Sequence, residues 1–169
     1  TRLSMREYHQ NLQEIVIPRH RKSDPDALLD QHEARQLRGV LGSLQWLVAQ
    51  IRFDMSFGVS TLQGESPPTI KTLMRANALV REFKRDPHFE LIFRPVDYRS
   101  AGIVAISDAA LGNVKLNGSN EGAVTEKVYS QACYFILLAD QNLLSGKQGS
   151  FNIIDARSHR IPRVCRSTY

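Results

Sequence analysis

The chain has 169 residues, 42% of them hydrophobic and 23% charged, which suffices for roughly one domain and excludes an intrinsically disordered chain. Its net charge of +5 suits contact with polyanions but excludes the strong basicity of ribosomal proteins. No apolar run approaches the ~18 residues that a membrane-spanning helix needs, so we expect no membrane partner. Two cysteines are too few for a disulfide framework, so we expect a reducing compartment.

The first thirty residues predict a strand, a helix and a connector. Apolar side chains between residues 1 and 17 have the spacing of a short strand followed by an amphipathic helix that ends before Pro18. The stretch from Pro18 to Asp30 is charged and contains a second proline, and it has few side chains to bury. We therefore expect it to be an exposed connector.

The next region predicts a long helix. Apolar residues from Leu37 to Ile51 recur at i, i+3, i+4 and i+7, which is one face of a helix. Gly39 and Gly42 lie inside it and predict that another backbone approaches closely at that point. Trp46 lies on or near the apolar face, so we expect a core residue rather than a platform for stacking bases.

Two shorter helices follow. Asp54 is placed to cap the first by accepting a hydrogen bond from an amide near Ser56, and Gly64 is placed to end it. The second begins near Thr69, carries Lys84 and Arg85 at its C-terminal end, where the helix dipole is negative, and is closed by a proline at position 87.

After the helices the hydrophobic period changes from 3.6 to 2. Residues 89–93 alternate as in a strand, and the β-rich runs 103–106, 128–138 and 151–154 predict a meander of three antiparallel strands. The segments 113–126 and 140–150 contain Gly, Asn and Ser and are predicted to be loops or turns. The fold class that follows is α+β, with a helical N-terminal region before the sheet.

Asp108 is the first candidate for chemistry. It follows the apolar run 103–106, so we expect it at the end of a strand, where a rigid element would hold the carboxylate past the sheet edge. Metal-dependent phosphodiester cleavage uses carboxylates in such places, because Mg²⁺ prefers oxygen ligands. One aspartate cannot supply a complete site, and position alone favours the alternative that Asp108 only caps a turn.

The C-terminal stretch from residue 156 to 169 is the second candidate. It contains four arginines and no acidic residue, so it could lie along phosphates, although a solvated basic face is an equally good interpretation. The five histidines form no His-x₃-His pair, and phosphate-loop, dinucleotide-binding and nucleophile-elbow motifs do not occur. The four arginines are Arg157, Arg160, Arg163 and Arg166.

Two blocks of the sequence carry a resemblance to a known family. The run Leu-Arg-Gly-Val-Leu-Gly-Ser-Leu-Gln-Trp-Leu at 37–47 resembles a Tyr-Arg-x-x-x-Gly-Ser-Leu-x-Tyr-Leu block of copia-type retrotransposon polyproteins. The run Arg-Phe-Asp-Met-Ser-Phe-Gly-Val-Ser at 52–60 resembles their Arg-Pro-Asp-Ile-x-Phe-x-Val-Ser block. Further on, Ser107, Asp108 and Ala109 match a Ser-Asp-Ala motif, so the likeness covers nearly the whole chain.

The resemblance implies a divergent, truncated part of such a polyprotein. Residues 1–86 would be the helical C-terminal, thumb-like region of reverse transcriptase, and residues 87–169 the N-terminal half of a ribonuclease H-like domain with an incomplete sheet. Phe53 departs from the family's proline, and Ala110 and Leu111 stand where Asp-Trp is frequent. By resemblance, Asp108 would be a catalytic Mg²⁺ ligand in cleavage of the RNA strand of an RNA–DNA hybrid.

The expected function is therefore that of a fragment of an enzyme. The parent would have RNA-directed DNA polymerase and hybrid ribonuclease activities, and this chain alone, holding only Asp108 of the catalytic set, is expected to be inactive. Its partners would be nucleic acid and the remainder of the polyprotein, in cytoplasmic particles and in the nucleus. The alternatives are a non-catalytic nucleic-acid-binding module, which would bind through the four arginines, and a decayed element without function.

Overall fold

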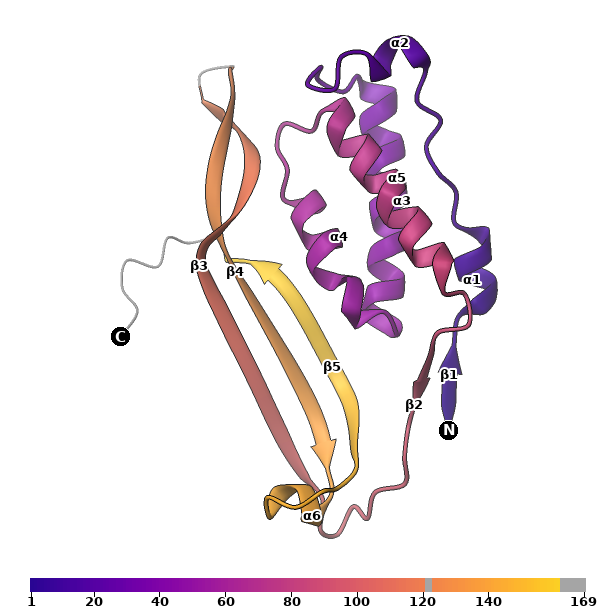
Figure 1. Cartoon of the computed structure of the whole chain (residues 1–169), viewed down its shortest axis with the longest axis vertical. Coiled ribbons are helices and arrows are strands. Elements are labelled where there is room, and N and C mark those ends of the chain that lie inside the picture. Colours follow the sequence, from indigo (N-terminus) through magenta and orange to yellow (C-terminus); the bar gives the residue numbers. More distant parts are fainter. Residues whose placement is uncertain (121–122, 162–169) are drawn as a thin grey trace.

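The computed structural model describes residues 1–120 and 123–161. The helices come first in the chain and the long strands come last (Figure 1). The helical segments are α1 (Arg6–Asn11), α2 (Arg19–Lys22), α3 (Gln31–Gln50), the 3₁₀ turn η1 (Phe53–Met55), α4 (Ser56–Gln63), α5 (Ile70–Arg85) and α6 (Gln141–Leu144). The strands are β1 (Arg2–Ser4), β2 (Glu90–Ile92), β3 (Gly102–Asn120), β4 (Ala123–Ala139) and β5 (Phe151–Arg160).

The predicted N-terminal strand and helix are both present, but the helix is shorter than expected. β1 pairs antiparallel with β2, and α1 ends at Asn11 instead of continuing to Pro18. The cause lies in the β-branched run Ile15, Val16 and Ile17, which disfavours helix. An α5 side chain, Asn77, also binds both backbone groups of Ile15 and so holds this segment away from helical geometry.

Helix α3 begins six residues before the first apolar residue of its pattern. Asp30 accepts a hydrogen bond from the Glu33 amide at 2.8 Å, and Glu33 accepts one from the Asp30 amide at 2.9 Å, which completes a capping box. The expected close backbone contact at Gly39 and Gly42 is wrong, because a Cβ at either position would meet nothing within 4 Å. Trp46 is 52% exposed, so its assignment to the core is also wrong.

The core lies between α3, α4, α5 and the extended segment that follows α1. Phe83 on α5 and Leu44 and Leu47 on α3 are completely buried. Burying one such side chain contributes about 1.5–3 kcal/mol, so packing rather than helix propensity holds the three helices together. The buried apolar residues of the two core clusters are Leu12, Ile15, Ile17, Leu37, Leu41, Leu44, Leu47, Val48, Val59, Leu62, Ile70, Leu73, Ala76, Val80 and Phe83.

The long strands form the predicted antiparallel meander in the order β3-β4-β5. The predicted loop at 113–126 is wrong, because β3 and β4 extend as a ladder through most of it. Gly112 has a positive φ of 58° and lies at a register shift between Ala110 and Val114. Gly112 therefore marks a bulge inside a continuous strand, which runs on into the predicted loop.

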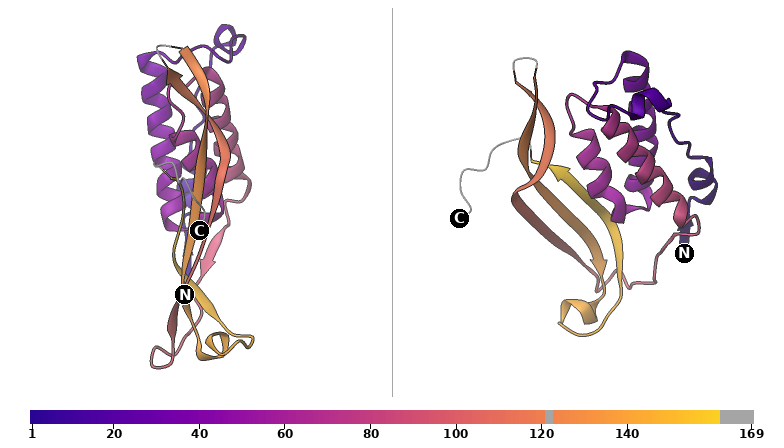
Figure 2. Two further views of the ribbon diagram at one scale, coloured as in Figure 1. Left: turned by 90° about the vertical axis from the view of Figure 1, so that its left-hand side faces the viewer. Right: turned by 45° about the horizontal axis from the view of Figure 1, so that its top comes forward.

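The sheet lies beside the helices with β5 nearest to them (Figure 1). In the left-hand view of Figure 2, the strands overlap in a narrow band in front of the helices, so the edge of the sheet points toward the helices. The α+β class with a helical N-terminal region is thus confirmed, whereas a ribonuclease H-like identity for the sheet stays a prediction. Within the described residues, no helix has the length and apolarity to cross a membrane.

Candidate functional site around Asp108

Asp108 lies in the middle of β3, so its predicted place at the end of a strand is wrong. The ladder continues through Ala109 and Ala110 and resumes beyond the bulge. Asp108 pairs with Cys133 on β4, and Cys133 pairs with Ser158 on β5. Since directly paired residues project to the same face of a sheet, these three side chains lie on one face.

That face and the turn leading into α4 form a groove of about 330 Å³. Two aromatic residues, Phe53 and Phe57, line it from the helical side, and Asp108 and Phe135 line it from the sheet. The groove therefore combines an aromatic wall with carboxylate oxygens. The remaining lining residues are Asp54, Ser56, Ala110, Gln131, Ala132, Cys133, Tyr134, Ala156, Arg157 and Ser158.

Helix α4 is fixed to the sheet by two polar side chains. The Ser56 hydroxyl accepts a hydrogen bond from the backbone N–H of Ser158 at 2.8 Å and donates to its carbonyl at 3.4 Å. Gln131 donates to the hydroxyls of Ser60 at 3.2 Å and Ser158 at 2.9 Å. A serine at the start of α4 thus occupies the backbone groups that an additional strand would use on the edge of β5.

The two aspartates of the groove differ in their partners. Asp54 does not cap α4 as expected, because its carboxylate binds Arg52 through Nε at 2.9 Å and Nη2 at 2.8 Å. Asp108 is exposed and accepts a hydrogen bond from the Ala109 amide at 2.8 Å. Among the described residues Asp108 has no ion-pair partner, so it is the groove carboxylate that is available to a cation.

This donor set does not by itself suit the Mg²⁺ that the resemblance implies. Such ions need several oxygen ligands, and two-metal cleavage needs carboxylates shared between two ions. In residues 1–120 and 123–161, no three His, Cys, Asp or Glu side chains come close enough to hold an ion together. We therefore derive no catalytic step through Mg²⁺ for this chain alone.

The candidate arginines divide between the two faces of β5. Arg157 pairs with Tyr134 and Arg160 pairs with Gln131, and positions three apart on a strand point to opposite faces. Arg160 donates to the Gly64 carbonyl at 3.1 Å, and its guanidinium lies 4.5 Å from the centre of the Tyr129 ring. Arg157 is exposed. Arg163 and Arg166 lie outside the described residues.

A small polar cluster lies beside Arg157, where Tyr134, Asp155 and Arg157 line a pocket that the sheet forms with α3. The Tyr134 hydroxyl donates to an Asp155 carboxylate oxygen at 2.9 Å, and this bond raises the pKa of Tyr134.

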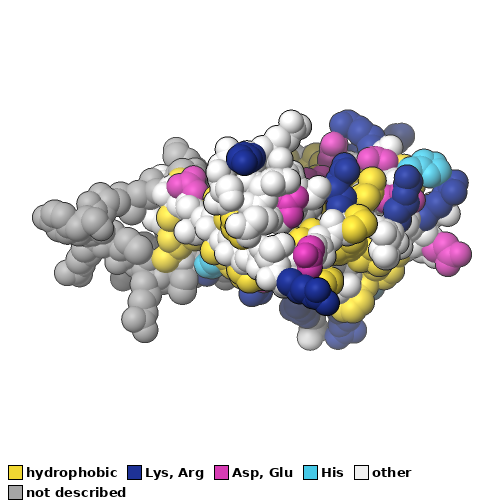
Figure 3. Space-filling view, turned by 90° about the horizontal axis from the view of Figure 1, so that it is seen from below, with side chains coloured by type: hydrophobic (Ala, Val, Ile, Leu, Met, Phe, Trp, Pro, Cys, Tyr) yellow, Lys and Arg dark blue, Asp and Glu magenta, His cyan; other side chains and the backbone are white. Residues whose placement is uncertain are grey.

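On the face seen in Figure 3, Lys and Arg side chains are interspersed with acidic and hydrophobic ones. The positive charge on this face is therefore divided into small patches.

A buried network beneath the groove was not predicted from the sequence. Arg52 lies between the rings of Phe83 and Phe89, with its guanidinium carbon 5.1 Å and 4.9 Å from their centres. Its Nη1 atom faces Nε2 of the fully buried His9 at 3.5 Å. The Arg-x-Asp spacing was visible in the sequence, but nothing in the sequence indicated that His9, forty-three positions earlier, meets this arginine.

Comparison with known proteins adds no relative. No protein-family model, curated protein or solved structure matches the chain.

Proposed function

We propose that the chain is a segment of a copia-like polyprotein that joins the helical end of a reverse transcriptase to the beginning of a ribonuclease H domain. The observation that carries the proposal is the position of Asp108, an exposed carboxylate on the first of three consecutive antiparallel strands that follow a helical region. This order is the one that the Ser-Asp-Ala motif and the preceding blocks imply. The partners would be an RNA–DNA hybrid and the rest of the polyprotein, in cytoplasmic particles and in the nucleus.

In this proposal Asp108 is one member of a carboxylate set whose other members belong to the longer polypeptide. The groove supports this division, because its second carboxylate, Asp54, is held by Arg52 and lies in a structural ion pair. Of the two groove aspartates, Asp108 is the one that has no cationic partner among the described residues, as a metal ligand requires. The isolated chain should therefore fold with Asp108 exposed on β3 and have no hydrolytic activity of its own.

Cleavage of a labelled RNA–DNA hybrid in Mg²⁺ tests the proposal. The 169-residue chain should give background cleavage, and a longer polypeptide from the same reading frame should cleave the RNA strand. In the longer polypeptide, Asp108→Asn should lower the rate by at least about a hundredfold, since it removes one metal ligand and one charge. The exposed Asp155, which lies on β5, gives the control variant Asp155→Asn, which should retain activity.

Two results would overturn the proposal. One is robust cleavage by the 169-residue chain that Asp108→Asn abolishes, because the chain would then hold a complete site. The other is a longer polypeptide that binds hybrid without cleaving it, with an affinity that is unaffected by Asp108→Asn and lost with Arg157→Gln. That second result would identify a nucleic-acid-binding module, whose contacts are phosphate-directed and therefore strongly salt-dependent.

A further inference from the structure

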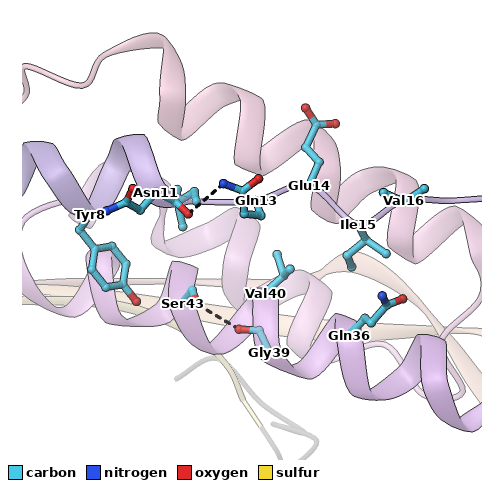
Figure 4. Close-up of a pocket in the computed structure, with 11 residues that line it drawn as sticks. Tyr8, Asn11, Gln13, Glu14, Ile15, Val16, Gln36, Gly39, Val40 and Ser43 are labelled. Carbon is cyan, nitrogen blue, oxygen red and sulfur yellow. Dashed lines mark hydrogen bonds between the residues drawn. The ribbon is translucent and has the colours of Figure 1, made fainter.

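A second groove lies on the opposite side of the helices, between α3 and the extended segment that follows α1 (Figure 4). Its volume is about 510 Å³. In Figure 4 the extended segment and α3 run alongside each other, with the side chains of Tyr8 and Val40 in the space between them. The groove is therefore elongated, and two elements of different kinds form its walls.

One wall presents free backbone groups. The N–H of Ile15 donates to the Asn77 side chain and its C=O accepts from the same side chain, both at 2.8 Å, on the side of α5. In an extended chain, the backbone groups of neighbouring residues point in opposite directions. Those of Glu14 and Val16 therefore point away from Asn77, and both residues line the groove.

These backbone groups have no partner among the described residues. The N–H and C=O groups of Glu14 and Val16 make no hydrogen bond to any backbone or side chain in residues 1–120 and 123–161. The side chains at these positions do not block access, because the Glu14 carboxylate binds Arg81 and Val16 is 86% exposed. The segment thus has the properties of an unpaired strand edge.

The other wall has room for a second strand. Gln36, Gly39, Val40 and Ser43 line the groove at helical spacing along two turns of α3. Gly39 has no side chain, and a Cβ there would meet nothing within 4 Å. The Ser43 hydroxyl bonds the Gly39 carbonyl in its own helix, so it does not cross the groove. The absence of a side chain at Gly39 therefore leaves this part of the α3 wall open.

We propose that this groove binds an extended peptide segment of a partner protein, which adds as a strand beside Glu14–Val16. The backbone of the peptide would supply the donors and acceptors that Glu14 and Val16 lack, and a small aliphatic side chain would lie over Gly39 against Val40. An extended peptide fits because the groove offers alternating backbone groups along one wall and a mainly apolar floor. Among the described residues that line the groove, Glu14 is the one with a charged side chain, and it is already paired with Arg81, so we expect an uncharged peptide.

The chain offers a matched pair of variants. Gly39→Leu fills the floor of the groove, whereas Gly42→Leu adds the same side chain on the same helix outside it. Both glycines lie inside α3 with open space around them, so each substitution should raise helix propensity without a clash. Thermal unfolding verifies that both variants fold.

The probes are three capped pentapeptides, Thr-Val-x-Val-Thr with Gly, Ala or Val at the centre, and their N-methylated forms. We expect the amide resonances of Glu14 and Val16 to shift and their hydrogen exchange to slow on titration with at least one peptide. The Ile15 amide, already bonded to Asn77, should remain protected throughout. Gly39→Leu should weaken binding at least about tenfold and Gly42→Leu less than about twofold, and N-methylation should abolish it because pairing needs the peptide N–H groups.

Several results would overturn the inference. They are no response at Glu14 and Val16 to any of the three peptides, equal loss of binding in both variants, or undiminished binding of the N-methylated peptides. Protection of these two amides that depends on protein concentration without peptide would show that a second copy of the chain is the occupant instead.

Discussion

At the scale of single residues, the most informative side chain is Arg52. The Arg52 side chain is 5% exposed, binds Asp54 in a bidentate ion pair and lies between two aromatic rings. It also donates toward Nε2 of His9, whose Nδ1 lies 3.0 Å from the Met5 carbonyl, which assigns the ring proton to Nδ1. The sequence showed the Arg-x-Asp spacing, but the partners on α1 and α5 depend on tertiary packing and could not be predicted.

Arg52→Met should therefore destabilise the protein even though it preserves an unbranched side chain. The variant leaves the buried His9 acceptor unpaired and removes both cation–π contacts, for a combined loss of about 2–4 kcal/mol in urea unfolding. Asp54→Asn is the control and should cost about 1 kcal/mol, because the Asn carbonyl oxygen can still accept one hydrogen bond from Arg52 and the Asp54 side chain is 48% exposed. Equal stabilities of wild type and Arg52→Met would contradict this account.

The ion pair between Arg21 and Glu33 makes a pH-dependent contribution to stability. Glu33 accepts two hydrogen bonds from the guanidinium and one from the Asp30 amide, and the bond from Arg21 is the main cause of its lowered pKa. Because the pKa is lower in the folded state than its ordinary value of 4.5, the stabilisation is complete above that value and is lost as the pH falls through the folded pKa.

Glu33→Gln should consequently make the free energy of unfolding fall less steeply as the pH is lowered. Urea unfolding between about pH 6 and pH 3 measures this dependence. The control is Glu14→Gln, whose ion pair with Arg81 is exposed and should contribute little. If the free energy of unfolding of Glu33→Gln fell with pH as steeply as that of the wild type, the pair with Arg21 would not form in solution.

At the scale of elements, the sequence predicted whether a segment is a helix or a strand better than it predicted where that helix or strand begins and ends. The 3.6-residue period located α3 and α5, the alternation of apolar residues located β2, and β-rich runs located β3, β4 and β5. Boundaries were missed where local signals disagree with tertiary pairing. The composition of segment 113–126 suggested a loop, but β4 supplies ladder partners on both sides of the bulge at Gly112, and this pairing keeps β3 continuous. A local sequence pattern does not show which residues of another strand will pair with the segment.

The junction between α4 and β5 depends on Ser56, a residue that the sequence suggested only as a hydrogen-bond donor near a helix end. Ser56→Ala should destabilise the protein by about 1–3 kcal/mol, because the backbone N–H of Ser158 loses its acceptor in a partly buried place. Hydrogen exchange at the Ser158 amide should quicken more than the global stability explains. Ser43→Ala, which removes a hydroxyl that bonds within its own helix, is the control and should leave that amide unchanged.

At the scale of the whole molecule, the sheet is attached to the helices by one edge. The described residues give β3 a single neighbour, β4, so its outer edge is unpaired. Large apolar side chains on the sheet remain exposed, including Ile103 at 62% and Ile154 at 53%. An unpaired edge beside exposed apolar side chains favours association between strands of different molecules.

The chain should therefore self-associate as its concentration rises, and Ile103→Lys should shift this association to higher concentration by placing a charge at the edge. Light scattering after gel filtration measures the molar mass of the wild type and of Ile103→Lys as a function of concentration. Met74→Lys provides the control, because Met74 is 41% exposed on α5, in the helical region, and should leave association unchanged. A sharp thermal transition of a monomer at every concentration would contradict the expectation.

The candidate site was predictable only in part. The sequence identified Asp108 by its place in a motif, but it placed the residue at a strand end because the β-rich run appeared to stop there. It could not predict that Asp54 is held by Arg52, or that Arg157 and Arg160 lie on opposite faces of β5. Both facts depend on strand register and on contacts between distant segments, which no local pattern specifies.

We propose that Asp108 belongs to a carboxylate set that is completed outside this chain. Sequencing the transcript on both sides of the segment tests it most directly. We predict an Asp-Asp pair upstream, a Glu within one or two helical turns after Tyr169, and further Asp residues later in the same reading frame. An in-frame stop directly after Tyr169, or neutral residues at those positions, would contradict the account.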